Sequence, residues 1–313
     1  MLSPLQIALF AYRRPDHLDR ALKSLSNNIN SNIVDLKIIC DGPKTNSLNE
    51  KKNINEVRTV ASSWESCKKF NNVRCIFKES NDGLAVSIIR GATDIINNYG
   101  HVIVLEDDLE TSPYFINYMR DGLSCYENDK NVASIHAYSY PINNVEKRSY
   151  FLRGAGSWGW GTWKRAWDCL ETNGDKLRRI ITSLNETNEF DFYGTRNMME
   201  MLCDQISGRN DSWAILWHAS TFIKKMYTLH PGTSLVKNVG FDGSGTHCKV
   251  KSNDFDVTLS ERPESVIRQG IEEDVELMSE LLKYFNKIKN KRRFPGIRKL
   301  LRQLRKFTVG RLL

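Results

Sequence analysis

The sequence lacks the features that mark several protein classes. Its seven cysteines form an odd, scattered set without a C-x-x-C pair, which argues against a disulfide framework or a structural zinc site. No apolar run is long enough to cross a bilayer, and the N-terminus lacks the basic start and apolar stretch of a signal peptide. We therefore expect a soluble globular chain that stays in the cytoplasm.

Acidic residues are absent from the last part of the chain. Residues 284–313 hold eleven lysines or arginines and no aspartate or glutamate, which leaves 34 of the 45 basic residues against 37 acidic ones before them. That slightly acidic body carries no nucleic-acid-binding signature. In the tail, apolar residues recur at helical spacing, at Ile297, Leu300, Leu301 and Leu304. This pattern is typical of an interfacial amphipathic helix, so we expect contact with an anionic membrane surface. A disordered cationic tail or a helix docked on the body are the alternatives.

An apolar stretch that ends in three carboxylates stands out. Residues 101–105 are mostly β-branched or aliphatic and run directly into Glu106, Asp107 and Asp108. This is typical of a buried parallel strand, and ligands of open α/β sheets bind at such carboxyl ends. The nearest basic residues along the chain are Arg90 and Arg120. Because hard oxygen ligands favour Mg²⁺ or Mn²⁺, we expect a divalent ion there; a helix cap is the alternative.

The chain before this stretch alternates strands with helices. Strands are expected at 5–12, 36–40 and 73–77, and helices near 16–25, 56–70 and 85–97. After the acidic strand, a helix at 113–127 and a strand at 132–138 follow. This order predicts an α/β fold with a mostly parallel sheet flanked by helices on both sides.

Two segments of the second half look functional. Residues 154–163 pack three tryptophans and four glycines into ten positions, which suggests a site where rings stack on a sugar or a base. Hydrophobic packing is the alternative for any single tryptophan. Residues 240–247 form a glycine-rich loop that is suited to close over a ligand.

Taken in order, these segments resemble nucleotide-sugar glycosyltransferases of the GT-A fold, and within them the N-acetylglucosaminyltransferase I family. The resemblance covers roughly residues 5–249 and rests on the Glu-Asp-Asp version of the D-x-D motif after an apolar strand. It implies a Rossmann-like sheet with a smaller acceptor-side region. We place the nucleotide-sugar-binding half at 1–140, the acceptor-binding and catalytic half at 141–282 and the basic tail at 283–313.

The resemblance also implies roles for single residues. Asp108 would ligate Mn²⁺ or Mg²⁺, and Asp211, before Trp213, would be the catalytic base, although a helix N-cap also explains an aspartate there. The tryptophans Trp158, Trp160 and Trp213 would contact the acceptor. The residues expected to contact the donor are Phe10, Ala11, Arg13, Asp41, Asn81, Glu106, Asp107, Ser244 and His247. Asn81 stands where animal members of the family carry a histidine, so this contact departs from the family's pattern.

These roles predict a metal-dependent transferase. It would move a hexosyl or N-acetylhexosaminyl group from a nucleoside-diphosphate sugar, UDP-linked by resemblance, to a saccharide or lipid-linked acceptor, with inversion. With the basic tail, this suggests bacterial surface polysaccharide synthesis on the inner face of the plasma membrane. A sugar nucleotidyltransferase and a non-catalytic carbohydrate-binding protein are the alternatives. The first is disfavoured because the turn at 10–15 lacks the glycines that such enzymes carry.

Overall fold

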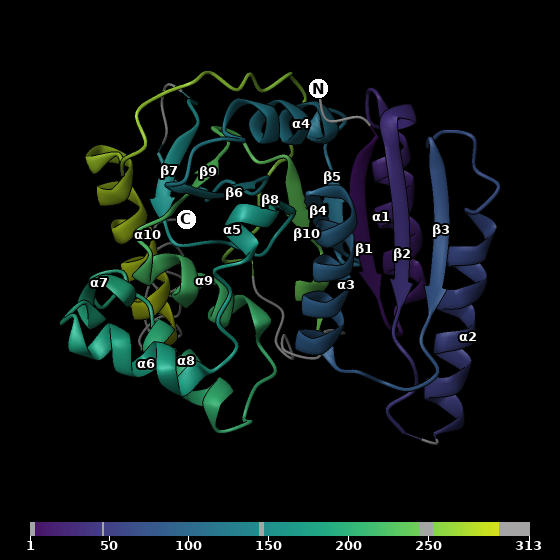
Figure 1. Cartoon of the computed structure of the whole chain (residues 1–313), viewed down its shortest axis with the longest axis horizontal. Helices are drawn as coiled ribbons and strands as arrows, with labels where there is room; N and C mark the ends of the chain where they lie inside the picture. Colours follow the sequence, from purple (N-terminus) through teal and green to yellow (C-terminus); the bar gives the residue numbers. More distant parts are fainter. Residues whose placement is uncertain (1–3, 46, 144–146, 244–252, 294–313) are drawn as a thin grey trace, which may run out of the picture.

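The first half of the chain folds as alternating strands and helices. The computed structural model describes residues 4–45, 47–143, 147–243 and 253–293 (Figure 1). The elements up to the acidic cluster are β1 (Leu5–Ala11), α1 (Pro15–Ser26), β2 (Val34–Cys40), α2 (Leu48–Ser63), β3 (Asn72–Phe77), α3 (Leu84–Tyr99) and β4 (His101–Glu106). The four strands are parallel and lie in the order β3-β2-β1-β4. Their carboxyl ends therefore meet at one edge of the sheet.

The second half completes the same sheet. Its elements are β5 (Leu109–Thr111), α4 (Phe115–Cys125), β6 (Val132–His136), β7 (Tyr150–Arg153), β8 (Trp160–Trp163), α5 (Lys164–Trp167), α6 (Gly174–Ser183), α7 (Thr187–Phe190), α8 (Met198–Ile206), α9 (Trp213–Ile223), β9 (Tyr227–His230), β10 (Val236–Asn238) and α10 (Val275–Arg293). The full order is β3-β2-β1-β4-β8-β6-β9-β7, with β8 antiparallel to both of its neighbours. Strands β5 and β10 pair separately as a small antiparallel sheet.

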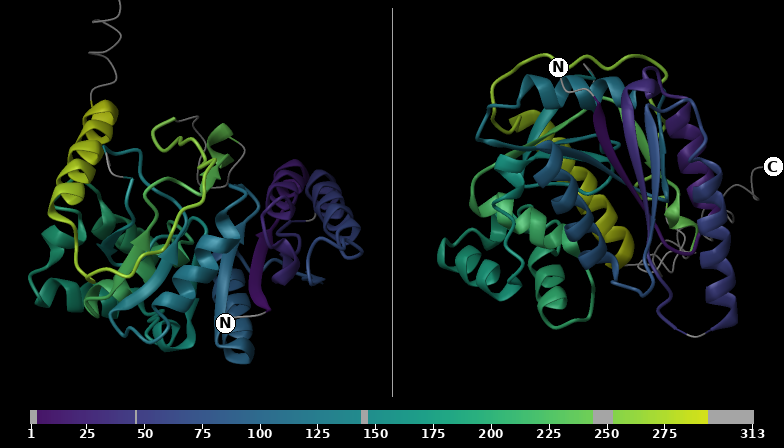
Figure 2. Two further views of the ribbon diagram at one scale, coloured as in Figure 1. Left: turned by 90° about the horizontal axis from the view of Figure 1, so that it is seen from above. Right: turned by 45° about the vertical axis from the view of Figure 1, so that its right-hand side comes forward.

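Side-chain alternation places helices on both faces of the sheet. In β1, Leu5, Ile7 and Leu9 pack with the buried sides of α1, α2 and α4, whereas Ala8 and Phe10 pack with α3, α5 and α9. Figure 2 shows α1 and α2 side by side, on the side of the sheet away from α3. The predicted α/β class, with a mostly parallel sheet flanked by helices, is confirmed.

Several expected elements differ from those observed. Helix α2 begins and ends earlier than the expected 56–70, and the tryptophan-rich segment supplies strand β8 in the middle of the sheet. Helix α10 runs through the expected boundary at residue 283, and Phe285 within it is buried against β7. The apolar tail positions 297–304 lie outside the described residues. Among the described helices, none combines the length and the apolar character needed to cross a membrane.

Candidate functional site

The three carboxylates lie where the sequence predicts, at the carboxyl end of β4. Glu106 ends the strand opposite Phe10 of β1, and the N–H of Asp107 donates to the Phe10 carbonyl at 2.9 Å. The Asp107 carboxylate accepts from the N–H of Tyr12 at 3.4 Å. The acidic turn is therefore bound to the end of the neighbouring parallel strand.

Arg14 supplies a cation that the sequence analysis missed. Its guanidinium forms an ion pair with Asp107 and a second with Asp108 at 3.0 Å, and all three side chains are mostly buried. The chain neighbours Arg90 and Arg120 had suggested that no local base could neutralise the cluster. The register of β1 against β4 brings Arg14, just before α1, across to it. If all three carboxyl groups were ionised, one guanidinium would leave two negative charges uncompensated.

The electrostatics of the cluster reflect this imbalance. Burial, together with the charges of Asp108 and Asp107, raises the pKa of Glu106 to about 8. Burial also raises the pKa of Asp107 to about 6, although the Arg14 guanidinium acts in the opposite direction. Further positive charge would therefore stabilise the ionised cluster.

This donor set fits a hard divalent ion. Adjacent carboxyl groups that share a single guanidinium suit Mg²⁺ or Mn²⁺. Asp108 is the more exposed of the two aspartates, with 16% of its side chain accessible against 4% for Asp107. Within the described residues, no three His, Cys, Asp or Glu side chains form a ready-made metal cage. A site of one or two carboxylates completed by substrate phosphates agrees with both observations.

The start of the glycine-rich loop lies against the same cluster. The N–H of Val239 donates to the Asp108 carbonyl at 2.9 Å, and a Cβ at Gly240 would lie 2.3 Å from Asp108 Oδ2. A side chain at position 240 would therefore have to displace the Asp108 carboxylate. His17 Nε2 lies 3.2 Å from Asp242 of the loop. Ser244 and His247, the expected donor contacts of this loop, lie outside the described residues.

Asp41 lies at the end of β2 and organises the loop before α3. Its N–H donates to the Ala11 carbonyl at 3.0 Å, which fixes it beside the end of β1. Its carboxylate accepts from the N–H groups of Asp82 at 2.9 Å and Gly83 at 3.1 Å, and from Asn81 Nδ2 at 2.9 Å. The two predicted donor residues Asp41 and Asn81 are thus in direct contact with each other.

Asp211 reaches the same loop from the second half of the chain. The N–H of Ala85, in the first turn of α3, donates to Asp211 Oδ2 at 3.2 Å, and a Cβ at Gly83 would lie 2.9 Å from that oxygen. Asp211 itself is exposed to solvent. The helix-cap alternative is therefore observed, but the helix is α3 and not the one that follows Asp211. Asp41 and Asp211 thus both contact the short segment that leads into α3.

Three of the expected donor contacts lie at the end of β1 or just after it, with different exposures. Phe10 is buried, and its ring lies against Gly91 of α3, while Ala11 is also buried. Arg13 is exposed, with its guanidinium 5.8 Å from the centre of the Tyr12 ring. Of these expected donor contacts, only Arg13 presents its side chain freely to solvent.

The tryptophans require a correction. Trp160 is fully buried and stacks between Trp213, at 5.1 Å between ring centres, and Trp167, at 5.5 Å. Trp160 and Trp213 therefore belong to the core and offer no ring face to an acceptor. Trp158 is only partly buried, and its ring meets Phe241 of the glycine-rich loop edge to face at 5.6 Å. Of the three expected acceptor contacts, Trp158 alone has surface available.

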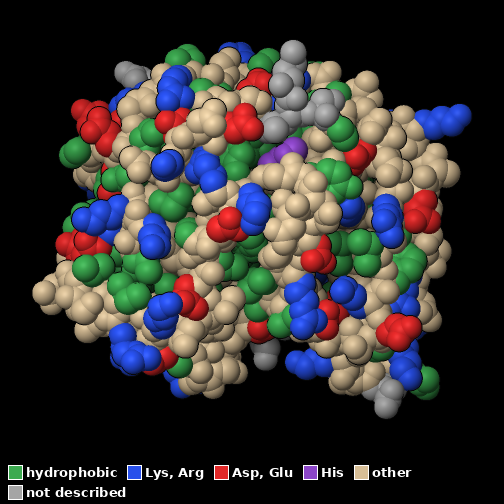
Figure 3. Space-filling model, viewed as in Figure 1, with side chains coloured by type: hydrophobic (Ala, Val, Ile, Leu, Met, Phe, Trp, Pro, Cys, Tyr) green, Lys and Arg blue, Asp and Glu red, His purple; other side chains and the backbone are tan. Residues whose placement is uncertain are grey.

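The surface around this edge of the sheet is mixed in charge. Figure 3 shows basic and acidic side chains interspersed over the face viewed, without a large area of one sign. The same view shows a notch at the lower edge of the molecule, between the side built from α6–α9 and the side built from α2 and β3. The carboxyl ends of β2 and β3 point toward this lower edge in Figure 1.

No protein-family model matches the chain, and neither does any curated protein. Among solved structures, it is similar to the mannosyltransferase PcManGT from Pyrobaculum calidifontis, solved with GDP-Man and Mn²⁺, at 8% identity and a TM-score of 0.37, over 59% of this chain and 47% of that one. It is also similar to residues 1–349 of TarS from S. aureus, solved with UDP-GlcNAc, at 10% identity and a TM-score of 0.31, over 44% of this chain and 36% of that one. The chain thus spans less than half the length of either structure.

Proposed function

We propose that the protein is a metal-dependent glycosyltransferase, which moves a sugar from a nucleoside-diphosphate sugar, UDP-linked, to a hydroxyl group of a saccharide or lipid-linked acceptor. The observation that carries this proposal is the acidic cluster after β4, where three carboxyl groups share a single cation, the guanidinium of Arg14. Asp41 and Asp211 are held at the loop that follows β3. We thereby assign a separate carboxylate to each role: Asp108 to the metal, Asp41 to the donor and Asp211 to the general base.

Asp108 is the residue we assign to the metal. Its carboxylate is more exposed than that of Asp107 and lies directly against Gly240 of the glycine-rich loop. When bound, Mn²⁺ or Mg²⁺ supplies the positive charge that stabilises a nucleoside diphosphate as a leaving group. Glu106 and Asp107 remain to accept hydrogen bonds from donor hydroxyls or from water.

Asp211 is the residue we assign as general base. Its carboxylate is exposed, and it is not engaged with Arg14 or with the acidic cluster in the described structure. A carboxylate in this position can accept the proton of an attacking acceptor hydroxyl, which corresponds to direct displacement with inversion. The hydrogen bond from Ala85 fixes the carboxylate against the N-terminus of α3.

Asp211→Asn tests the assignment. Asparagine retains an oxygen that can accept from Ala85, so the fold should persist, whereas loss of proton abstraction should lower the transfer rate by a factor of about 10² to 10⁴. Calorimetry with UDP and Mn²⁺ should show unchanged binding. The matched control is Asp204→Asn, since Asp204 lies on α8 and pairs with Arg209 at the surface. Full transfer activity in Asp211→Asn would show that Asp211 is not the general base.

Asp108→Ala tests the metal site. This variant should lose transfer activity and also lose the Mn²⁺ dependence of UDP binding. Incubation of the wild-type protein with a panel of nucleotide sugars should release nucleoside diphosphate only with a divalent ion. Release of pyrophosphate from a sugar phosphate and a nucleoside triphosphate would indicate a nucleotidyltransferase, and no turnover together with saccharide binding would indicate a binding protein.

The cellular setting of this reaction is part of the proposal. A basic tail suited to an anionic surface, on an enzyme that handles activated sugars, favours a peripheral position on the inner face of a bacterial plasma membrane. The acceptor would then be a lipid-linked intermediate of a surface polysaccharide.

A further inference from the structure

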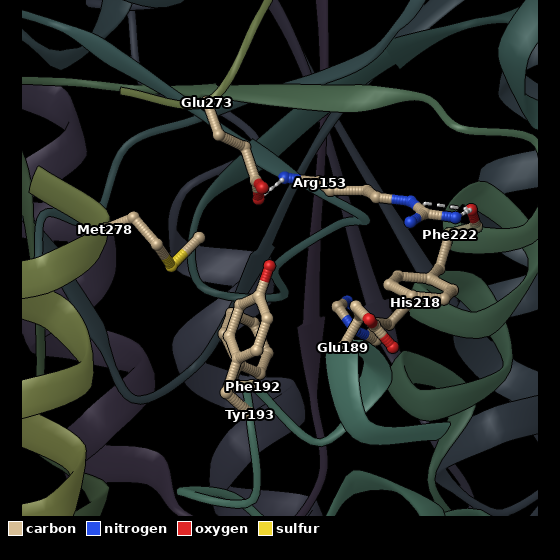
Figure 4. Close-up of a pocket in the computed structure, with 8 residues that line it drawn as sticks. All are labelled: Arg153, Glu189, Phe192, Tyr193, His218, Phe222, Glu273 and Met278. Atoms are coloured by element: carbon tan, nitrogen blue, oxygen red, sulfur yellow. Dashed lines mark hydrogen bonds between the residues drawn. The ribbon is translucent and has the colours of Figure 1, made fainter. Parts of the chain in front are cut away.

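A pocket lies in the other half of the molecule, apart from the acidic cluster. This pocket has a volume of about 350 Å³, including the part open to solvent, and is bounded by the end of β7, the segment after α7, one side of α9 and the start of α10 (Figure 4). Strand β7 is separated from β4 by β8, β6 and β9. At about 4.8 Å per strand spacing, this places β7 roughly 19 Å from the acidic strand.

Two buried polar atoms that line this pocket have no hydrogen-bond partner among the described residues. They are Nε2 of His218, a residue that is only 4% exposed, and Oε2 of Glu189. Leaving such groups without a partner is costly, so their presence in a pocket points to a ligand that completes them. Figure 4 shows both side chains on the same side of the pocket.

Aromatic rings form another wall. Phe192 and Tyr193 follow α7, and both have positive φ angles, of 50° and 53°. Bulky residues rarely adopt this conformation, and clusters of such residues occur at ligand sites. The Tyr193 side chain is half exposed, at 50%, while Phe192 stacks on His218 with 5.8 Å between ring centres.

The charged side chains of the pocket exclude an anionic ligand. The Arg153 guanidinium pairs with Glu186 and donates from Nη2 to the Phe222 carbonyl at 3.0 Å, so its hydrogen-bonding capacity is largely used within the protein. Glu273 Oε1 accepts from the N–H of Arg153 at 2.9 Å. Glu189 and Glu273 add two carboxylates to the lining, so the pocket is rich in acceptors.

A sugar ring with hydroxyl groups would complement both the unpartnered polar atoms and the aromatic rings of this pocket. A hydroxyl group can donate to the Glu189 carboxylate, and it can either accept from or donate to His218 Nε2, whichever tautomer the Ala155 contact at Nδ1 selects. The apolar face of a pyranose ring can lie against Phe192 and Tyr193. An organic cation would match the carboxylates but would also face the guanidinium of Arg153.

We propose that this pocket binds one hexopyranose unit of a neutral saccharide, at a site separate from the acidic cluster. The proposal concerns binding alone and does not depend on the transfer reaction assigned above. If both hold, the protein contacts saccharide at two places that are several strands apart.

Saturation-transfer NMR on the full chain tests this site. The probes are the methyl glycosides of glucose, galactose, mannose and N-acetylglucosamine, with choline as the cationic alternative. We expect saturation transfer to at least one glycoside and a loss of affinity of at least tenfold in Tyr193→Ala. The matched control is Tyr99→Ala, since Tyr99 is also half exposed, at 48%, but lies at the end of α3. The control should bind as the wild type does.

Glu189→Met separates a binding role from a structural one. The change removes a buried oxygen without a partner while retaining side-chain length, so the melting temperature should be unchanged or higher. Glycoside affinity should nevertheless fall at least tenfold. The proposal is overturned if no glycoside binds, if both pocket variants bind as the wild type does, or if choline alone gives a signal that these variants remove.

Discussion

Replacing Arg14 with glutamine removes the guanidinium that contacts both aspartates of the acidic cluster. Asp107 and Asp108 have 4% and 16% of their side chains exposed, so both carboxylates would lose their ion-pair partner in a mostly dehydrated place. Breaking a buried pair by removal of one partner costs about 3–5 kcal/mol. Because Arg14 retains 19% exposure, we expect a value near the lower end, about 3 kcal/mol of unfolding free energy at pH 8.

The matched control is Arg20→Gln in helix α1, which begins directly after Arg14. Arg20 pairs with Glu110 at 3.4 Å with about half of its side chain exposed, and such surface pairs contribute about 0–1 kcal/mol. Urea unfolding of both variants at pH 8 measures the difference. Equal losses in the two variants would refute the view that Arg14 is the main internal counter-charge of the cluster.

The pH dependence gives an independent check on the Arg14 variant. The pKa of Asp107 is already raised to about 6 by burial, and loss of the guanidinium should raise it further. An acid whose pKa is higher in the folded state binds a proton there first, so its destabilising effect grows as pH rises through that pKa and fades at low pH. The cost of Arg14→Gln should therefore shrink from pH 8 to pH 5. A cost that stays constant would contradict this electrostatic account.

Three further predictions follow from other parts of the structure. Asp41→Ala should lower the unfolding free energy by about 2 kcal/mol and also raise the donor KM, since its carboxylate holds the loop before α3; urea unfolding and kinetics that both match wild type would contradict this. Burial lowers the pKa of His230 and of His218 to about 4, so each histidine should reduce stability by about 2 kcal/mol when pH falls from 8 to 5. In urea titrations at both pH values, the loss of unfolding free energy that these two histidines cause between pH 8 and pH 5 should be roughly half as large in His230→Gln as in the wild type. An unchanged pH dependence in the variant would count against this account. Truncation after Arg293 should abolish sedimentation with anionic liposomes while transfer to a small soluble acceptor survives, and the cut must lie beyond α10 because Phe285 is buried; truncated protein that still sediments with the liposomes would refute membrane contact through the tail.

The sequence predicted the first half well because its signals are local. Short apolar stretches mark β1, β2 and β4, and helical spacing marks α1 and α3, so the strand–helix alternation can be read without tertiary information. The position of the three carboxylates follows from the same rule, since parallel strands present their carboxyl ends at one edge. The helix α2 was misplaced because its polar surface gives a weak periodic pattern.

The predictions that failed concern residues whose contacts join segments far apart in the chain. Trp160 looked like a ligand contact because it lies in a glycine-rich run, yet its stacking partners Trp167 and Trp213 come from two later helices. Arg14 was assigned only to a turn, because nothing near it in the chain is part of the acidic cluster. Its pairing depends on the register between Phe10 of β1 and Glu106 of β4, which is fixed only when the sheet forms.

Strand β8 is synthesised after both of the strands that it pairs with, and this order affects folding during translation. Both β4 and β6 leave the ribosome before residues 160–163, which pair with His101–Val104 on one side and with Ile135 and His136 on the other. Until then, each of these apolar strands has an unpaired edge that can add a strand from another nascent chain. The other edge of β6, and the edge of β7 that faces it in the sheet order, must wait in addition for β9, which ends at residue 230. The yield of native protein in a cell should therefore depend on how long these edges remain open, so slower translation across residues 107–159 should increase aggregation and slower translation after residue 230 should not.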